Sequence, residues 1–353
     1  MSGVLDLARQ DLIGLQPYHH AAWEPTLERL HANELPWRGL GDNSASGLNR
    51  YPEPQPRELA DRLARLYGVP RERILMGRGS DEAIDLLVRG FCRAEHDRIM
   101  VCPPTFGMYK VAAHVQGAGI VEVPLDRARG FAPDEAALLD RWQPGTKILF
   151  LCSPNNPTGN LVDRALIERL CARLAGKALV VVDEAYIEFS GAASLSDALE
   201  RHVNLVVLRT LSKAYALAGA RCGTLLGDPA LVDLLRRMIA PYALAAPTIE
   251  AALHALEPPQ VVISQSRREL VIRERARVAA ALSKLHAVKT VWPSAANFLL
   301  IECRDAERAF RAVLAAGLLI RDVRSQPGLA QHLRITIGTP EQNERLLGAL
   351  EAA

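Results

Sequence analysis

Short apolar runs alternate with segments of helical periodicity through the middle of this chain. The runs are rich in Val, Ile and Leu, and we interpret six of them between residues 98 and 227 as strands: RIMVCPP, IVEVPL, KILFLCSP, ALVVVDEAY, NLVVLRTLS and GTLLG. Strands that are buried on both faces have this composition, and intervening helices such as residues 165–175 would cover those faces. The sequence therefore predicts an α/β fold with a large, mostly parallel sheet sandwiched by helices.

Three parts are expected along the 353 residues. Residues 1–39 show helical hints that are broken at Pro17, and we interpret them as an N-terminal arm. Residues 40–244 would form the large domain. A hinge-like stretch, 241–247, leads into residues 245–353, which read as helix and then strand, helix, strand, strand and helix. This order predicts a smaller α/β C-terminal domain.

Composition argues against several classes of protein. The formal net charge is +2 with acids and bases interspersed, so we expect no nucleic-acid partner. We also expect no signal peptide and no membrane partner, because no apolar run approaches the ~18 residues that a membrane span needs. The six cysteines are scattered without a CxxC pair. We therefore expect reduced thiols in a cytoplasmic protein and no metal site.

Three polar motifs lie in the same region of predicted strands. SPNNPTG (153–159) is a tight polar turn, and VVVDEAY (180–186) puts an acid at the end of a buried strand. RTLSKAYALAGARCG (209–223) holds Lys213 in a run of small residues, where its amine could form a Schiff base with a carbonyl cofactor. In the same motif, Arg221 could clamp a phosphate through two hydrogen bonds. A lone serine–lysine pair is more often solvated, but the order of the three motifs favours a cofactor site.

A fourth motif, GRGSDEAIDLLVR (77–89), reads as a strand end, a turn and a helix. Gly77 and Gly79 permit a tight turn, and Ser80 or Asp81 can cap the helix. The free backbone N–H groups at such a helix start can bind a phosphate. Turns of this kind are also common in any α/β fold, so the motif alone leaves both interpretations open.

The order NNPTG, DEAY and SKAYALAGAR resembles that of the fold-type I pyridoxal-phosphate (PLP) aminotransferases. The finer match is to the histidinol-phosphate aminotransferases, and it spans nearly the whole chain. The motifs that carry it, besides those above, are LHANELPW (30–37), NRYPEPQP (49–56), PPTFGMYK (103–110) and LRITIGTPEQNERLL (333–347). The resemblance implies the fold-type I architecture and PLP as the cofactor.

The resemblance also implies how each residue would serve the cofactor. Lys213 would form the Schiff base and move the proton from the substrate Cα. Asp183 would keep the pyridine nitrogen protonated. Asn156 and Tyr186 would hydrogen-bond the phenolate O3′, and Tyr109 would stack on the ring, although Tyr109 could equally be a core tyrosine.

The family pattern implies a set of donors to the cofactor phosphate: the backbone N–H groups of Ser80, Asp81 and Glu82, the Ser212 hydroxyl and Arg221. Tyr51 resembles the tyrosine that reaches this phosphate from the partner subunit. If it does so here, the active site lies at the interface of a homodimer.

Four residues resemble the family's substrate contacts. Arg334 would fork onto the substrate carboxylate or a shared anionic site, and Arg321 would help bind a substrate phosphate. Tyr18 in the N-terminal arm would close over the substrate, and Asn156 would also reach it. An Arg321 that is solvated and paired with its neighbouring aspartate remains an alternative.

The resemblance implies PLP-dependent transamination of L-histidinol phosphate with 2-oxoglutarate, giving imidazole-acetol phosphate and L-glutamate, in histidine biosynthesis. An aromatic-amino-acid aminotransferase and a threonine-phosphate decarboxylase are alternatives on the same fold. Leu35 departs from the family pattern, which usually has a second asparagine there. A regulatory PLP-binding module is disfavoured, because residues 1–40 are too few for a helix-turn-helix domain.

Overall fold

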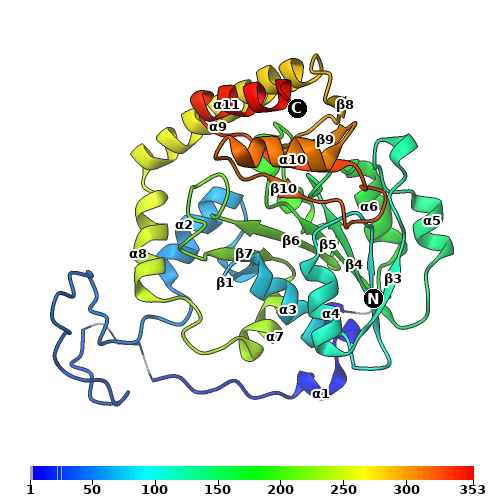
Figure 1. Cartoon of the computed structure of the whole chain (residues 1–353). Helices are drawn as coiled ribbons and strands as arrows, with labels where there is room; N and C mark the ends of the chain where they lie inside the picture. Colours follow the sequence, from blue (N-terminus) through cyan, green and yellow to red (C-terminus); the bar gives the residue numbers. More distant parts are fainter. Residues whose placement is uncertain (1–2, 22, 25) are drawn as a thin grey trace.

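A seven-stranded sheet forms the centre of the larger domain in this computed structural model, which describes residues 3–21, 23–24 and 26–353 (Figure 1). The strand order is β1-β7-β6-β5-β4-β2-β3. Strand β7 runs antiparallel to β1 and β6, and the other strands are parallel to one another, which confirms the mostly parallel sheet. The strands are β1 (Ile74–Gly77), β2 (Arg98–Val101), β3 (Gly119–Glu122), β4 (Thr146–Cys152), β5 (Leu179–Asp183), β6 (Leu205–Thr210) and β7 (Gly223–Leu226).

Helices cover both faces of this sheet, as the run composition predicted. Alternate residues of β5 enter two separate cores: Val180 and Val182 pack in one, and Leu179 and Val181 pack in the other. All four are fully buried, which explains why the strand lacks polar alternation. The first core includes α2 (Arg57–Tyr67), α5 (Glu135–Asp140), α6 (Arg164–Arg173) and α8 (Ala246–Ala255), and the second includes α3 (Ser80–Phe91), α4 (Met108–Gln116) and α7 (Pro229–Met238).

The smaller domain is built on a four-stranded antiparallel sheet with the order β10-β11-β9-β8. The first strand expected in this domain, residues 288–303, is divided into two, because the chain bends at residues 295–297. The strands are β8 (Val288–Val291), β9 (Phe298–Cys303), β10 (Arg321–Asp322) and β11 (His332–Thr336), and the helices of this domain are α9 (Pro258–Leu282), α10 (Ala306–Ala315) and α11 (Pro340–Glu351).

The passage between the two domains runs along α9. Ile249 and Leu253 of α8 pack on the core of the large domain, whereas Val278 and Leu282 at the end of α9 belong to the core of the small domain. By this packing α8 belongs with the large domain. We therefore place the boundary at the start of α9, one helix later than the 244/245 division that the sequence suggested.

The N-terminal segment has two parts: a start that packs on the large domain, and a longer stretch that leads to α2. A 3-10 helix (Val4–Leu7) packs in the large domain's core beside α7, and α1 (Gln10–Ile13) follows it. Figure 1 shows the chain between α1 and α2 extending away from the rest of the molecule. Several large apolar side chains there are exposed: Leu27, Leu30, Leu35, Trp37, Leu40 and Leu48. Across the described residues, no helix combines the length and apolar character of a membrane span.

Candidate active site

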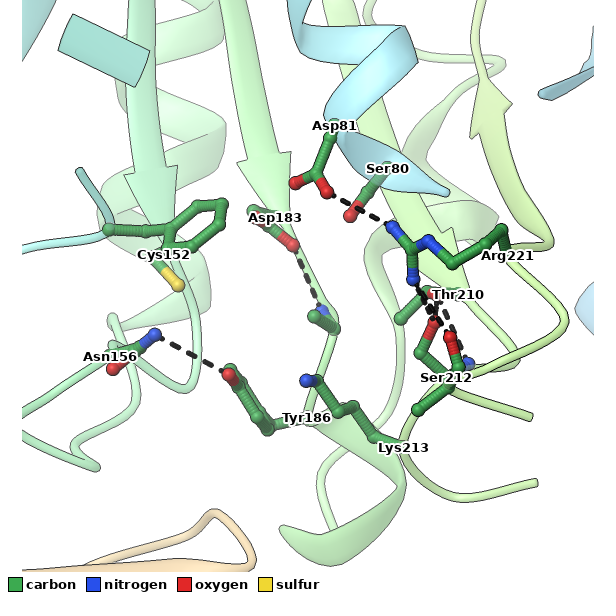
Figure 2. Close-up of a pocket in the computed structure, with 13 residues that line it drawn as sticks. Ser80, Asp81, Cys152, Asn156, Asp183, Tyr186, Thr210, Ser212, Lys213 and Arg221 are labelled. Atoms are coloured by element: carbon green, nitrogen blue, oxygen red, sulfur yellow. Dashed lines mark hydrogen bonds and ion pairs between the residues drawn. The ribbon is translucent and has the colours of Figure 1, made fainter. Parts of the chain in front are cut away.

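A cavity of about 120 Å³ lies at the carboxyl ends of β4, β5 and β6, beside the start of α3 (Figure 2). In open α/β sheets, ligands bind outside the carboxyl ends of the strands. The lining residues come from α3, the strand ends and the adjoining loops: Ser80, Asp81, Phe106, Cys152, Asn156, Asp183, Ala185, Tyr186, Thr210, Ser212, Lys213, Ala218 and Arg221. The cavity thus brings together side chains from all four polar motifs.

Lys213 lies in the turn that follows β6 and points into the cavity. Figure 2 shows its amine beside Tyr186, and Nζ is 5.7 Å from the centroid of that ring. Burial lowers the pKa of Lys213, and the positive charge of Arg334 lowers it further. A lysine in this setting is more readily present as the neutral amine, which is the nucleophilic form.

Asp183 ends β5 and is 2 % exposed. Its Oδ2 accepts a hydrogen bond from the Tyr109 hydroxyl at 2.8 Å, and its Oδ1 accepts one from the Ala185 backbone N–H at 3.1 Å. Burial raises the pKa of Asp183 to about 6, despite both bonds. Neither donor is cationic. A basic group placed in the cavity would therefore stabilise the carboxylate and be held protonated by it.

The start of α3 and the loop before β7 are in very close contact. A Cβ on Gly223 would lie 2.2 Å from the Gly79 carbonyl carbon and 2.3 Å from the Ser80 nitrogen, so only glycine fits. Gly79 has φ +85°, which also favours glycine, and a Cβ there would lie 2.6 Å from the Arg221 guanidinium. This approach brings the free N–H groups of the helix start next to Arg221.

Arg221 is bound on two sides. Its Nη2 lies 3.1 Å from Asp81 Oδ2, and its Nη1 donates to the Ser212 hydroxyl at 3.4 Å. Ser212 is fixed in turn by Thr210, whose hydroxyl lies 2.9 Å from the Ser212 Oγ and accepts from its backbone N–H at 3.1 Å. A guanidinium, a hydroxyl and a helix N-terminus around one end of a cavity form a site for an anion such as a phosphate.

The small domain contributes Arg334 to the opposite side. Arg334 Nη1 donates to Asn156 Oδ1, and Asn156 Nδ2 donates to the Tyr186 hydroxyl at 3.4 Å. Arg321 is the cross-strand partner of Arg334 in the β10–β11 pair and is exposed. Within the described chain, Arg334 and Arg321 form no ion pair with an acidic side chain. The alternative pairing of Arg321 with Asp322 is absent there, because Asp322 binds Arg324.

Tyr109 is a correction to the sequence prediction. It is fully buried below the cavity, its ring stacks on Phe150 with centroids 4.7 Å apart, and its hydroxyl bonds Asp183. The ring therefore presents no face to the cavity. Phe106, three residues earlier in the same motif, lines the cavity in its place. Sequence reasoning did not single out Cys152, Ala185 and Thr210, which line the cavity within or directly before the recognised motifs.

Arg321 and Arg334 lie outside the cavity lining of their own chain, and so do the predicted residues Tyr18, Tyr51 and Glu82. Tyr18 is 67 % exposed and packs edge-on against His20, and Tyr51 stacks on Tyr242 with centroids 4.5 Å apart. The Glu82 side chain turns back to bind Arg78. Tyr18 therefore does not close over the cavity of its own chain, because the arm that holds it extends away.

Comparison with known proteins identifies the family. Residues 21–350 match the family model described as aminotransferase class I and II. The chain belongs to this aminotransferase family. A histidinol-phosphate aminotransferase of Xanthomonas campestris pv. campestris is 49% identical to this aminotransferase over 354 residues, covering 99% of this chain and 98% of the relative. The resemblance stated from the motifs is confirmed.

Solved structures support the fold-type I architecture of this aminotransferase. A histidinol-phosphate aminotransferase of Clostridium acetobutylicum matches with a TM-score of 0.78 at 22% identity, covering 86% of this chain and 90% of that one. The enzyme of Sinorhizobium meliloti in complex with pyridoxal 5'-phosphate matches with a TM-score of 0.74 at 24% identity, covering 86% and 82%. At these identities the likeness shows the fold.

Aminotransferases of this family depend on PLP, and the cavity fits that cofactor. Asp183 supplies a buried carboxyl group with a raised pKa. A pyridine nitrogen beside it would lower that pKa, because the protonated nitrogen stabilises the carboxylate. An anion site lies beside the Gly79–Gly223 contact and is formed by Arg221, Ser212 and the start of α3. Lys213 lies between these two ends with its amine in the cavity. The donor set thus matches the ring, the phosphate and the aldehyde of one molecule.

Replacing Phe106 with alanine should weaken PLP binding by roughly threefold to tenfold, since an aromatic contact contributes about 0.5–1.5 kcal/mol beyond its buried area. Tyr109→Phe keeps the buried ring and should leave the affinity within about twofold, because only the bond to Asp183 is lost. Fluorescence titration of the cofactor-free protein with PLP measures both. A larger loss of affinity in Tyr109→Phe would restore the stacking role to Tyr109.

Proposed function

We propose that this aminotransferase catalyses the PLP-dependent exchange of the amino group between L-histidinol phosphate and 2-oxoglutarate, a step of histidine biosynthesis. The products are imidazole-acetol phosphate and L-glutamate. The observation that carries the proposal is the 49% identity to a histidinol-phosphate aminotransferase over nearly the full length of both chains. The pair Arg321 and Arg334 at the open side of the cavity supports it, since both substrates are anions.

Each end of the cavity would hold a different part of the cofactor. Asp183 would bind the pyridine nitrogen, and Asn156 and Tyr186 would hydrogen-bond the ring hydroxyl. The phosphate would be held by the backbone N–H groups of Ser80 and Asp81 together with Ser212 and Arg221, which already lie around one point. The backbone of Glu82, one residue further into α3, would complete that set.

PLP, when bound, supplies the carbonyl carbon that takes up the amino group and a ring that withdraws electrons from it. Lys213 would anchor the cofactor covalently until the substrate amine displaces it. Its free Nζ would then accept the proton from the substrate Cα and deliver it to the cofactor carbon. The lowered pKa of Lys213, caused first by burial, favours the neutral amine that can accept that proton.

Arg334 would recognise the anionic end of each substrate in turn. Its guanidinium faces Asn156 and lies 5.2 Å from the Phe298 ring, half-buried at the inner face of the small sheet. Its Nε is buried without a hydrogen-bond partner among the described atoms, so part of its donor capacity is free for a ligand. Arg321 on the neighbouring strand would add a second guanidinium for the phosphate.

We propose that the active form is a homodimer in which Tyr51 reaches the cofactor phosphate of the partner subunit. The support is the exposed apolar arm, whose large side chains mark a surface that another chain would cover. Tyr18, in the same arm, would then act on the partner's cavity rather than on its own. The buried free thiols of all six cysteines fit a cytoplasmic enzyme.

A half-reaction tests the proposed activity. Holoenzyme mixed with histidinol phosphate alone should convert its cofactor absorbance stoichiometrically to that of the amino form, and 2-oxoglutarate should restore it. L-Phenylalanine should drive the same change much more slowly. Release of CO₂ from threonine phosphate without any need for an oxo acid would instead establish the decarboxylase. No spectral change with histidinol phosphate would refute the proposal.

Arg334→Ala is expected to raise KM for both histidinol phosphate and glutamate by about tenfold to a hundredfold, because each substrate loses charge-assisted hydrogen bonds worth about 1.5–3 kcal/mol. Steady-state kinetics with each substrate varied in turn measures this. Arg308→Ala, at an exposed position on α10, is the matched control and should change neither KM. A loss confined to one substrate would argue against a shared anion site.

A further inference from the structure

A second cavity lies on the far side of the turn that holds Lys213. It measures about 370 Å³ and is formed by α8, the first half of α9 and residues 213–217. We call it the rear cavity. Lys213 is the one residue that lines both it and the active-site cavity described above. Its volume is within the range of roughly 300–1,000 Å³ that is typical of small-molecule sites.

The rear cavity is basic. Lys213, His254, Arg267 and Arg268 line it, and none of its lining residues is an aspartate or glutamate. The start of α9, residues 258–268, also contains no acid. Of these basic residues, His254 contacts an acid, with its Nδ1 3.1 Å from Glu257 Oε2. The described lining therefore carries basic side chains and no acidic one, which favours an anionic ligand.

Its two arginines differ from Arg277, near the end of the same helix. In the described chain, Arg267 and Arg268 make no ion pair, and the Arg268 guanidinium lies 5.7 Å from the centroid of the Tyr215 ring. Arg277, by contrast, is paired with Glu274 and Glu344. Adjacent guanidinium groups without acid partners, facing a cavity, have the donor geometry that binds carboxylates and phosphates.

We propose that the rear cavity binds a small carboxylate or phosphate anion, held by Arg267 and Arg268, that modulates Lys213 through the turn between the two cavities. The turn is tight: the Ala216 N–H donates to the Lys213 carbonyl at 3.3 Å, and Ala216 has φ +57°. An anion there would contact residues 214–217 and stabilise the protonated form of the lysine nitrogen. Anion binding in the rear cavity and protonation of the Lys213 nitrogen would then each favour the other.

Calorimetric titration of the Arg334→Gln holoenzyme tests this, because the substitution removes the active-site anion contact and PLP fills the phosphate site. The probes are inorganic phosphate and, separately, succinate. We expect one site per chain for at least one probe, and the probe that binds identifies the anion class. Adding Arg267→Gln and Arg268→Gln should weaken it at least tenfold, since each lost charged hydrogen bond is worth about 1.5–3 kcal/mol. Arg273→Gln, exposed on the same helix but outside the cavity lining, is the matched control and should bind normally.

A second readout reports the link to Lys213. In the Arg334→Gln holoenzyme, the pH midpoint of the cofactor absorbance should move upward when the rear cavity fills, and this shift should disappear when Arg267 and Arg268 are also replaced. Absence of binding by both probes, or binding that survives the double substitution, would overturn the proposal. Binding without any change in the midpoint would overturn the coupling. Each outcome is independent of whether histidinol phosphate is the substrate.

Discussion

Lys213→Ala is expected to abolish transamination, lowering kcat by at least about 10⁴-fold, because the variant loses both the nucleophile and the proton carrier. In the cavity described above, the Lys213 amine is the only lysine nitrogen among the lining residues, so no neighbour replaces it. Glutamate formation measures the rate. Mass spectrometry after borohydride reduction measures covalent attachment of PLP, which should be complete in the wild type and absent in the variant.

Two controls separate this effect from a loss of fold. Lys213→Arg should be as inactive as the alanine variant, since a guanidinium keeps its proton and cannot act as the base. Lys110→Ala removes a surface lysine that pairs with Glu122 at 2.7 Å, and it should leave kcat unchanged. Turnover retained by Lys213→Ala, or PLP still attached at another lysine, would mean that the catalytic amine has been misassigned.

Asp183→Asn should lower kcat by about 10²–10³-fold, the usual effect of removing one preorganised charged contact. Asparagine keeps the shape of the side chain and can still accept the bond from Tyr109, but it offers no negative charge to a pyridine nitrogen. The half-reaction with histidinol phosphate should slow accordingly while PLP remains bound. Tyr109→Phe, which keeps the carboxylate, should be affected far less. An unchanged rate would show that Asp183 is structural.

The same residue predicts a pH dependence of the cofactor-free protein. Burial raises the pKa of Asp183 from 3.8 to about 6. Between these values the folded state binds more protons than the unfolded state, so the free energy of unfolding should fall as the pH rises from about 4 to about 6, by up to about 3 kcal/mol. Denaturant titrations at several pH values measure the slope. It should be shallower in Asp183→Asn, and equal slopes would contradict the assigned burial.

Several predicted residues that line the cavity follow strands recognisable from composition. Asp183 ends a run of fully buried aliphatic residues, and Lys213 follows another, so the parallel strands bring both to the same edge of the sheet. Arg221 reaches this edge differently, because it precedes β7, which runs antiparallel to β6.

Other residues depend on information that a local pattern does not contain. Phe106 and Tyr109 are three residues apart, and which ring faces the cavity is set by how the chain enters α4. Arg321 and Arg334 become neighbours only through the β10–β11 register, across a nine-residue connection whose course the sequence leaves open. Tyr18 and Tyr51 lie between α1 and α2 and outside the cavity lining of their own chain, so their predicted contacts depend on the partner subunit that we propose.

The bond between Arg334 and Asn156 joins the two domains through one guanidinium. Arg334 Nη1 donates to the amide oxygen of Asn156, and Asn156 Nδ2 donates to Tyr186. Under the role that we propose for Arg334, a substrate anion that took over this donor would free the Asn156 amide to change its contact with Tyr186. Substrate binding would then alter the surroundings of Tyr186, so a variant that binds substrate more tightly need not turn over faster.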